Sequence, residues 1–197
     1  MRVYHSPGSR STRVLWTLEE AGVPYDVTVL TLEERRGTEH RRLHPLGRVP
    51  VIELDDGQLM FESAAICLHL GDLFPESGLV PHMGSAERPQ VLQWVLFAMT
   101  EVEPAVGRWS RARREHRDDT EERERFDERA SVLSTAIGDG PWLLGDRFTV
   151  ADIVLSRMLN VVSDELAGFY PELELHAYRE RAFARDAHQR ANAVGRP

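Results

Sequence analysis

The sequence predicts an α/β domain followed by an all-helical domain. Strand and helix signals alternate through the first 75 residues, whereas apolar residues recur every three or four positions in most of the chain after residue 86. Residues 76–85 separate these regions with proline, serine and glycine and no periodicity, which is typical of an interdomain linker. We therefore expect domains at residues 1–75 and 86–197, each long enough to bury a hydrophobic core.

The first domain should begin with a strand and a helix. Residues 2–5 alternate between polar and apolar side chains, and a Ser-Pro-Gly-Ser turn then leads into a helix from about Ser9 to Ala21. Residues 25–30 are predicted as a second strand, and residues 32–44 as a charged, irregular helix or loop.

Two further strands and a helix complete the predicted first domain. Residues 50–54 and 58–61 have strand character, and the pair Asp56-Gly57 between them favours a type I′ hairpin turn. A helix then opens at Ser63. The predicted order is β-α-β-(α)-β-β-α.

The second domain should be built from amphipathic helices. Residues 86–109 have helical periodicity, and residues 111–129 carry many charges of both signs, which indicates a solvated helix face. Residues 149–152 form a Thr-Val-Ala-Asp capping box. The helix that follows is apolar nearly all round, so we expect it at the centre of this domain.

Composition excludes several classes of protein. The net charge of -8 argues against a general nucleic-acid surface, and no apolar run is long enough to cross a membrane. The single cysteine, Cys67, excludes an internal disulfide and a multi-cysteine metal site. Since the N-terminus also lacks the pattern of a secretory signal, we expect a cytoplasmic protein.

Several motifs resemble one family. Residues 46–52 and 61–66 are similar to the glutathione-binding half of the glutathione transferases, and residues 4–8 to the first strand and turn of the bacterial members. Residues 145–152 resemble the family's C-terminal capping motif. The resemblance implies a thioredoxin-like N-terminal domain, an all-helical C-terminal domain, glutathione as cosubstrate and a homodimer.

The same resemblance assigns the residues that would bind glutathione. It implies a cis bond before Pro50, so that the backbone of Val49 pairs with the cysteinyl part of the tripeptide as an added strand. Ser63 at a helix N-terminus would take the γ-glutamyl carboxylate, and Glu62 would accept from the γ-glutamyl ammonium. Arg48 would pair with the glycyl carboxylate. A plain turn proline and an N-capping serine are the structural alternatives.

Four residues near the N-terminus are candidates for the group that activates the glutathione thiol. Ser9 is the first candidate, because it lies four residues before Arg13, the offset found in serine-type members of the family. Ser11 and Arg10 are second candidates, and Tyr4 is the third, because tyrosine-type members use a phenol at a strand end. Helix capping without catalysis is the alternative for Ser9.

Two departures from the family pattern matter. The bacterial beta-class pattern continues with Ala-Cys-Ser where this chain has Ser-Arg-Ser at residues 9–11, so a mixed disulfide with glutathione is excluded there. His44 stands where the family usually has asparagine, and we interpret it as a turn residue. His40 and His44 lack a third ligand for zinc, so no metal is expected. Arg35 is a second candidate for the glycyl carboxylate.

The function that this resemblance implies is glutathione transfer. The protein would stabilise the thiolate of glutathione and add it to a small hydrophobic electrophile, or reduce a hydroperoxide, in detoxification. The alternative is a non-catalytic interaction module, as in the transferase-like stringent starvation proteins, since a fold does not guarantee an activity.

Overall fold

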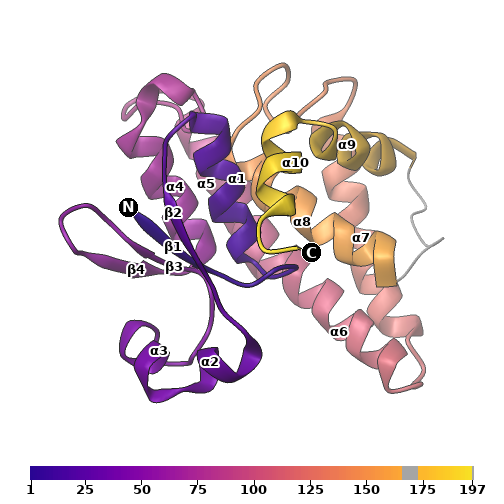
Figure 1. Cartoon of the computed structure of the whole chain (residues 1–197). Coiled ribbons are helices and arrows are strands. Elements are labelled where there is room, and N and C mark those ends of the chain that lie inside the picture. The colour runs from indigo at the N-terminus through magenta and orange to yellow at the C-terminus, as the bar shows by residue number, and fades with distance from the viewer. Residues whose placement is uncertain (166–172, 197) are drawn as a thin grey trace. The chain divides into compact units, whose positions relative to one another are not determined.

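The computed structural model of the chain describes residues 1–165 and 173–196, which form two compact units (Figure 1). The first unit comprises Met1–Val80 together with Arg185–Pro197, and the second comprises Pro81–Ala184. The expected domain of residues 86–197 therefore differs from the second unit at its end, because the C-terminal helix belongs with the N-terminal residues. None of the described helices is long and apolar enough to span a lipid bilayer.

The first unit is built on a four-stranded mixed sheet, with the strand order β2-β1-β3-β4. β1 (Arg2–His5) pairs in parallel with β2 (Asp26–Val29) and antiparallel with β3 (Val51–Glu53), which pairs antiparallel with β4 (Leu59–Phe61). The order of these strands with the intervening helices is the thioredoxin-like arrangement that the resemblance implies.

The hairpin between β3 and β4 differs from the predicted type I′ turn. A type I′ turn needs positive φ at both central residues, but only Gly57 has positive φ, at 84°. The Gly57 amide donates to the Leu54 carbonyl, and the Leu54 amide donates to the Gln58 carbonyl. These bonds describe a three-residue loop with a left-handed glycine at its end, in which Asp56 Oδ1 accepts from the Gln58 amide.

The two long helices of the first unit are α1 (Ser11–Ala21) and α4 (Ser63–Leu73), which pack against each other. α1 starts two residues later than predicted, because the Ser9 amide is used in a turn to the Ser6 carbonyl. The helix ends at Gly22, whose φ of 67° satisfies the left-handed C-cap.

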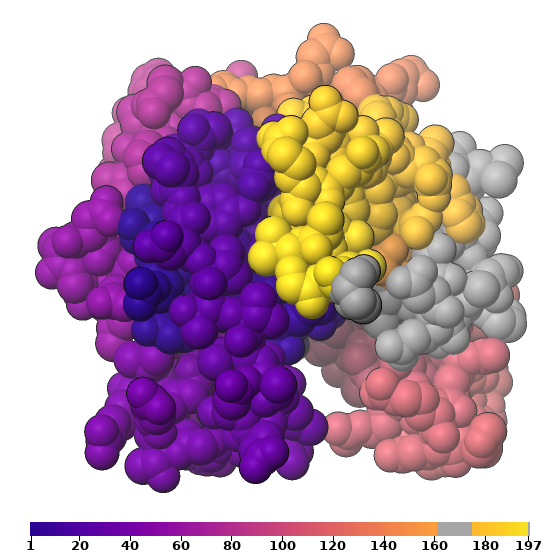
Figure 2. Space-filling model, in the orientation of Figure 1, coloured from indigo at the N-terminus to yellow at the C-terminus, as the bar shows by residue number. Residues whose placement is uncertain are grey.

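The C-terminal helix α10 (Asp186–Ala193) packs along α1, and Figure 2 shows its yellow surface against the indigo N-terminal residues. Arg185 makes a bidentate ion pair with Glu20, with both N–O distances at 2.6 Å. The rings of Trp16 and His188 meet edge to face at 4.6 Å. Sequence periodicity could not assign α10 to this unit, because these contacts join residues far apart in the chain.

Two short helices, α2 (Leu32–Arg36) and α3 (Thr38–Leu43), occupy the region predicted as an irregular helix or loop. Thr31 and Glu34 form a capping box that begins α2. A 3₁₀ turn, η1 (Pro75–Ser77), follows α4.

The second unit begins with one long helical run. α5 (Arg88–Phe97) continues through a π-helical segment, η2 (Ala98–Val102), into α6 (Glu103–Arg114). Pro104 explains the π turn, because proline has no amide to donate and its ring displaces the preceding turn.

The remaining helices of the second unit are α7 (Thr120–Ile137), α8 (Val150–Glu165) and α9 (Leu173–Phe183). α8 contacts α5, α6 and α9, and its described residues before Asn160 are buried, which confirms its predicted central place.

The predicted capping box at the start of α8 is present in part. The Asp152 carboxylate accepts from the Thr149 amide at 2.8 Å and hydroxyl at 3.0 Å, but the Thr149 hydroxyl accepts from Ala151 instead of Asp152. Asp152 also accepts from the Leu143 amide and the Tyr178 hydroxyl. Burial raises the pKa of Asp152, against the lowering effect of these hydrogen bonds.

Candidate functional site

The start of α1 brings two of the candidate catalytic residues together. The Ser9 and Ser11 hydroxyl oxygens lie 2.6 Å apart, and Ser9 also lies 2.7 Å from the Ser6 carbonyl. Ser9 is half-buried and Ser11 is buried. Arg10 between them is exposed. Ser9 is therefore the hydroxyl of this pair that reaches the surface.

Tyr4 does not join this cluster. Successive residues of a strand point to opposite faces of the sheet, and Tyr4 faces α3 while the buried His5 bonds to Ser11 near the start of α1. The Tyr4 phenol lies 3.5 Å from Glu53. The third catalytic candidate is thus on the other face of the sheet from Ser9.

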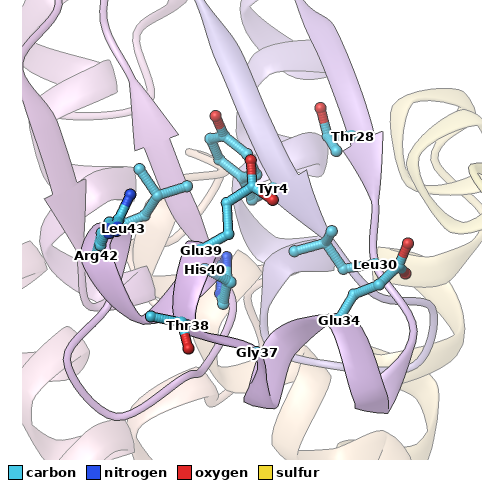
Figure 3. Close-up of a pocket in the computed structure, with 10 residues that line it drawn as sticks. All are labelled: Tyr4, Thr28, Leu30, Glu34, Gly37, Thr38, Glu39, His40, Arg42 and Leu43. Atoms are coloured by element: carbon cyan, nitrogen blue, oxygen red, sulfur yellow. The ribbon is translucent and has the colours of Figure 1, made fainter.

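Tyr4 instead lines a cavity of about 620 Å³ between the sheet and the helices α2 and α3. Figure 3 shows Tyr4, Thr28 and Leu30 on the sheet side, with Glu34 of α2 and the side chains of α3 opposite. His40 is 4% exposed in this region, and its Nε2 lies 2.8 Å from the Arg48 carbonyl. His40 therefore supports the loop that leads into β3.

That loop carries the candidate backbone site. The Val49-Pro50 peptide bond is cis, as the resemblance implies. Val49 is buried, whereas the Arg48 side chain is exposed, and its guanidinium forms no ion pair within the part of the chain described. Arg48 is therefore open to an anionic ligand.

Gly47 explains how the loop is held. It has φ 61°, and a Cβ at this position would lie 2.6 Å from the Arg35 carbonyl oxygen. Both the backbone conformation and the close approach require glycine. The backbone of Arg35, the second candidate for the glycyl carboxylate, thus lies beside the loop of Arg48.

Glu62 and Ser63 join β4 to α4. Glu62 has φ 72° and ψ 103°, and a backbone so placed costs a non-glycine residue about 1–3 kcal/mol. Its side chain is exposed. Among the described residues no side chain caps α4, so its first amides remain for another acceptor. Backbone strain beside an open helix N-terminus is a feature of binding sites.

Ser63 is the first residue of α4 and not its N-cap, which is Glu62. Ser63 is 2% exposed, and its Oγ accepts from the buried Arg13 guanidinium at 3.1 Å. Because Arg13 donates in this bond, the hydroxyl proton of Ser63 is directed elsewhere. Arg13 thereby orients the serine hydroxyl and brings a positive charge to this helix end.

His5 and Arg13 have no role assigned by the motifs of the sequence. The offset of Arg13 points to Ser9, but a buried arginine near a helix start also needs a partner of its own. His5 follows the inward alternation of β1 and is 1% exposed. An ionisable residue at an inward strand position was the signal for it.

The remaining candidates are structural. The His44 Nδ1 accepts from the Leu46 amide two residues on, as an asparagine side chain does in a turn. Burial also lowers the pKa of His44. Burial raises the pKa of Cys67 to about 11, so it is a protonated core residue at neutral pH. Within the residues described, no three His, Cys, Asp or Glu side chains form a metal-binding group.

Comparison with known proteins identifies the family. Residues 8–73 match the glutathione S-transferase N-terminal domain model, and residues 86–186 match the C-terminal domain model. These matches cover most of the chain, which therefore belongs to the glutathione S-transferase family, a family of transferase enzymes.

Individual relatives show the same similarity over at least four-fifths of the chain. Glutathione S-transferase GstA of Escherichia coli O157:H7 is 28% identical over 162 residues, which are 81% of each protein. A glutathione transferase structure from Methylococcus capsulatus str. Bath is 32% identical, with a TM-score of 0.85 over 97% of this chain and 96% of that one. A sphingomonad glutathione S-transferase solved with glutathione is 26% identical, with a TM-score of 0.81 over 98% and 97% of the two chains.

Proposed function

We propose that the first unit binds glutathione, that Ser9 stabilises its thiolate, and that the thiolate attacks a small hydrophobic electrophile or reduces a hydroperoxide. The observation that carries this proposal is the strained Glu62 beside the open N-terminus of α4. A backbone cost of this kind persists where surrounding structure and function require it.

The tripeptide would lie along the loop before β3. The γ-glutamyl carboxylate would accept from the Ser63 hydroxyl and the first amides of α4, and the γ-glutamyl ammonium would donate to Glu62. The cysteinyl backbone would pair with Val49. The exposed guanidinium of Arg48 would take the glycyl carboxylate, with Arg35 as the second candidate.

The groups of this site can supply the free energy needed to lower the pKa of the glutathione thiol. Lowering a thiol pKa from about 8.5 by about 2 units requires about 2.7 kcal/mol of thiolate stabilisation. A hydrogen bond from the Ser9 hydroxyl to a charged sulfur contributes about 1.5–3 kcal/mol. The N-terminus of α1 adds about 0.3–1 kcal/mol. Ser11 and Arg10 remain second candidates for this role.

The wider setting is also part of the proposal. The family implies a homodimer, and α5 exposes two large apolar side chains one turn apart, Leu92 at 36% and Leu96 at 60% exposure. Such a stripe suits a subunit contact. A cytoplasmic role in detoxification fits the single buried thiol, Cys67.

Glutathione affinity of variants tests the proposed site. Isothermal titration should show glutathione binding to the wild type, weakened about 10- to 150-fold in Glu62→Ala and Ser63→Ala, the loss of one charge-assisted hydrogen bond. Alanine retains a Cβ at position 62, so the backbone conformation has the same cost. Glu76→Ala is the matched control, since Glu76 is an exposed glutamate after the other end of α4.

The alternative is a non-catalytic interaction module on the same fold. A wild-type protein that binds neither glutathione nor S-methylglutathione would favour that alternative. Glutathione binding that is unchanged in Glu62→Ala and Ser63→Ala would instead show that the tripeptide binds elsewhere.

A further inference from the structure

A row of hydrogen-bonded groups leads inward from Ser9. The Ser9 Oγ lies 2.6 Å from the Ser11 Oγ, and the Ser11 Oγ lies 2.8 Å from the His5 Nδ1. On the other side of the ring, the His5 Nε2 lies 3.3 Å from the Val194 carbonyl oxygen after α10. Ser11 and His5 are buried, so the row joins a half-exposed hydroxyl to an imidazole inside the first unit.

The Val194 carbonyl at the inner end of the row decides which group donates in each hydrogen bond. A carbonyl oxygen only accepts, so the neutral ring of His5 carries its hydrogen on Nε2, and its Nδ1 accepts from the Ser11 hydroxyl. The oxygen of Ser11 is then an acceptor for the Ser9 hydroxyl. The Ser6 carbonyl, 2.7 Å from the Ser9 Oγ, is the other acceptor available to that hydroxyl. With His5 neutral, the Ser9 proton therefore points into the protein.

The inward orientation of the Ser9 hydroxyl proton affects how Ser9 can interact with a thiol. A hydroxyl whose proton points inward offers a lone pair to an outside ligand, so it can accept from a thiol but cannot donate to a thiolate. Ser9 donates to sulfur either after its hydroxyl rotates, which breaks its inward hydrogen bond, or after a proton moves along the row, which keeps every bond of the row.

We propose that His5 takes up the thiol proton of glutathione through the two serine hydroxyls. This inference rests on the proposed function, in which the glutathione sulfur faces Ser9. The S–H bond breaks as its proton passes to the Ser9 Oγ, the original Ser9 proton passes to the Ser11 Oγ, and the original Ser11 proton passes to the His5 Nδ1. The products are a thiolate and an imidazolium, with both serines neutral and Ser9 donating to sulfur.

The energetics make this transfer reversible. Free imidazole has a pKa about 2 units below that of a free thiol, so the transfer is unfavourable by about 100-fold before any stabilisation. The charge-assisted bond from Ser9 and the positive charge on His5 both favour the thiolate, as in other thiolate–imidazolium pairs. His5 is thus a positioning residue that acts through Ser11.

Other ionisable groups surround β1 in the first unit. Those on the neighbouring strands and helices are Asp26, Glu53, Arg10, Arg13, Glu19, Glu20, Asp186, His188 and Arg190. Glu19 and Glu20 pair with arginines of the C-terminal segment. The buried Arg13 cation of α1 donates to the Ser63 hydroxyl.

The test separates thiol ionisation from tripeptide binding. The His5→Asn variant retains an acceptor for the Ser11 hydroxyl but cannot take up a proton. We expect its affinity for S-methylglutathione to stay within about threefold of the wild type, because that ligand has no thiol proton. The pKa of bound glutathione, from thiolate absorbance against pH, should rise by about 1–2 units, with kcat at neutral pH falling about 10- to 100-fold and KM little changed. His188→Asn, which removes another buried histidine of the same unit, is the control.

A second pair of variants keeps the test decisive if His5→Asn does not fold. Ser11→Ala interrupts the row and should raise the thiol pKa in the same way, and Ser11→Thr restores a hydroxyl and should lower it again. A wild-type thiol pKa in either His5→Asn or Ser11→Ala would overturn the inference and leave the proposed function in place. Absence of S-methylglutathione binding to the wild type would overturn both.

Discussion

Replacement of Gly47 by alanine tests the packing of the loop that carries Arg48 and Val49. A left-handed conformation costs an alanine about 1–2 kcal/mol relative to glycine. The added Cβ would also lie 2.6 Å from the Arg35 carbonyl oxygen, so backbone must shift. Such overpacking costs about 1–3 kcal/mol more. We expect Gly47→Ala to lower the free energy of unfolding by about 2–5 kcal/mol in total.

Gly57→Ala is the matched control for this prediction. Gly57 has φ 84°, but a Cβ there meets nothing within 4 Å, so only the conformational cost applies. Urea denaturation should place Gly47→Ala clearly below Gly57→Ala in stability. Glutathione affinity should fall at least about tenfold in Gly47→Ala alone, the equivalent of about 1.4 kcal/mol. Equal destabilisation by the two substitutions would refute the proposed close contact between Gly47 and Arg35.

Three further predictions concern other parts of the chain. Asp152→Ala should lower the free energy of unfolding by about 3–5 kcal/mol, because buried donors lose their acceptor; a loss below 1 kcal/mol in urea denaturation would contradict this. Cys67, with its pKa raised by burial to about 11, should resist thiol reagents at neutral pH and react fully in urea. Rapid labelling of Cys67 in the native protein would show that its thiol is accessible, which would contradict the burial of Cys67. Arg185→Ala should cost about 1–2 kcal/mol by removing the ion pair to Glu20, and Glu20→Gln should cost a similar amount; if only one does so, the pair is not the cause.

Much of the fold follows from local patterns in the sequence. Alternation in residues 2–5 predicted β1 because one face of that strand is buried, and the apolar run after Thr149 predicted the central α8. Local patterns could not predict that α10 joins the first unit, since that depends on Glu20 and Trp16 meeting the end of the chain. The prediction of a type I′ hairpin turn was wrong, because a type I′ turn and a three-residue loop both use a glycine and the Asp56-Gly57 pair suits either.

In the candidate site, too, local motifs identify residues, whereas contacts between residues distant in sequence could not be predicted. The assignments of Ser9, Val49 and Ser63 are predictions from the resemblance to the family, and each residue lies close to the start of a helix or strand. The motifs gave no direction to the hydroxyls, which depends on partners distant in sequence, as in the bond from Arg13 to Ser63. Tyr4 was a candidate because tyrosine-type members of the family use a phenol at a strand end. The period of a strand places Tyr4 and His5 on opposite faces but does not say which face holds the ligand.

The structure of the protein with glutathione bound is the most direct test of the central proposal. We predict a γ-glutamyl carboxylate at Ser63, a cysteinyl backbone paired with Val49, and a sulfur within hydrogen-bonding distance of the Ser9 Oγ. Glutathione in the cavity on the other face of the sheet, with its sulfur near Tyr4, would contradict the proposal.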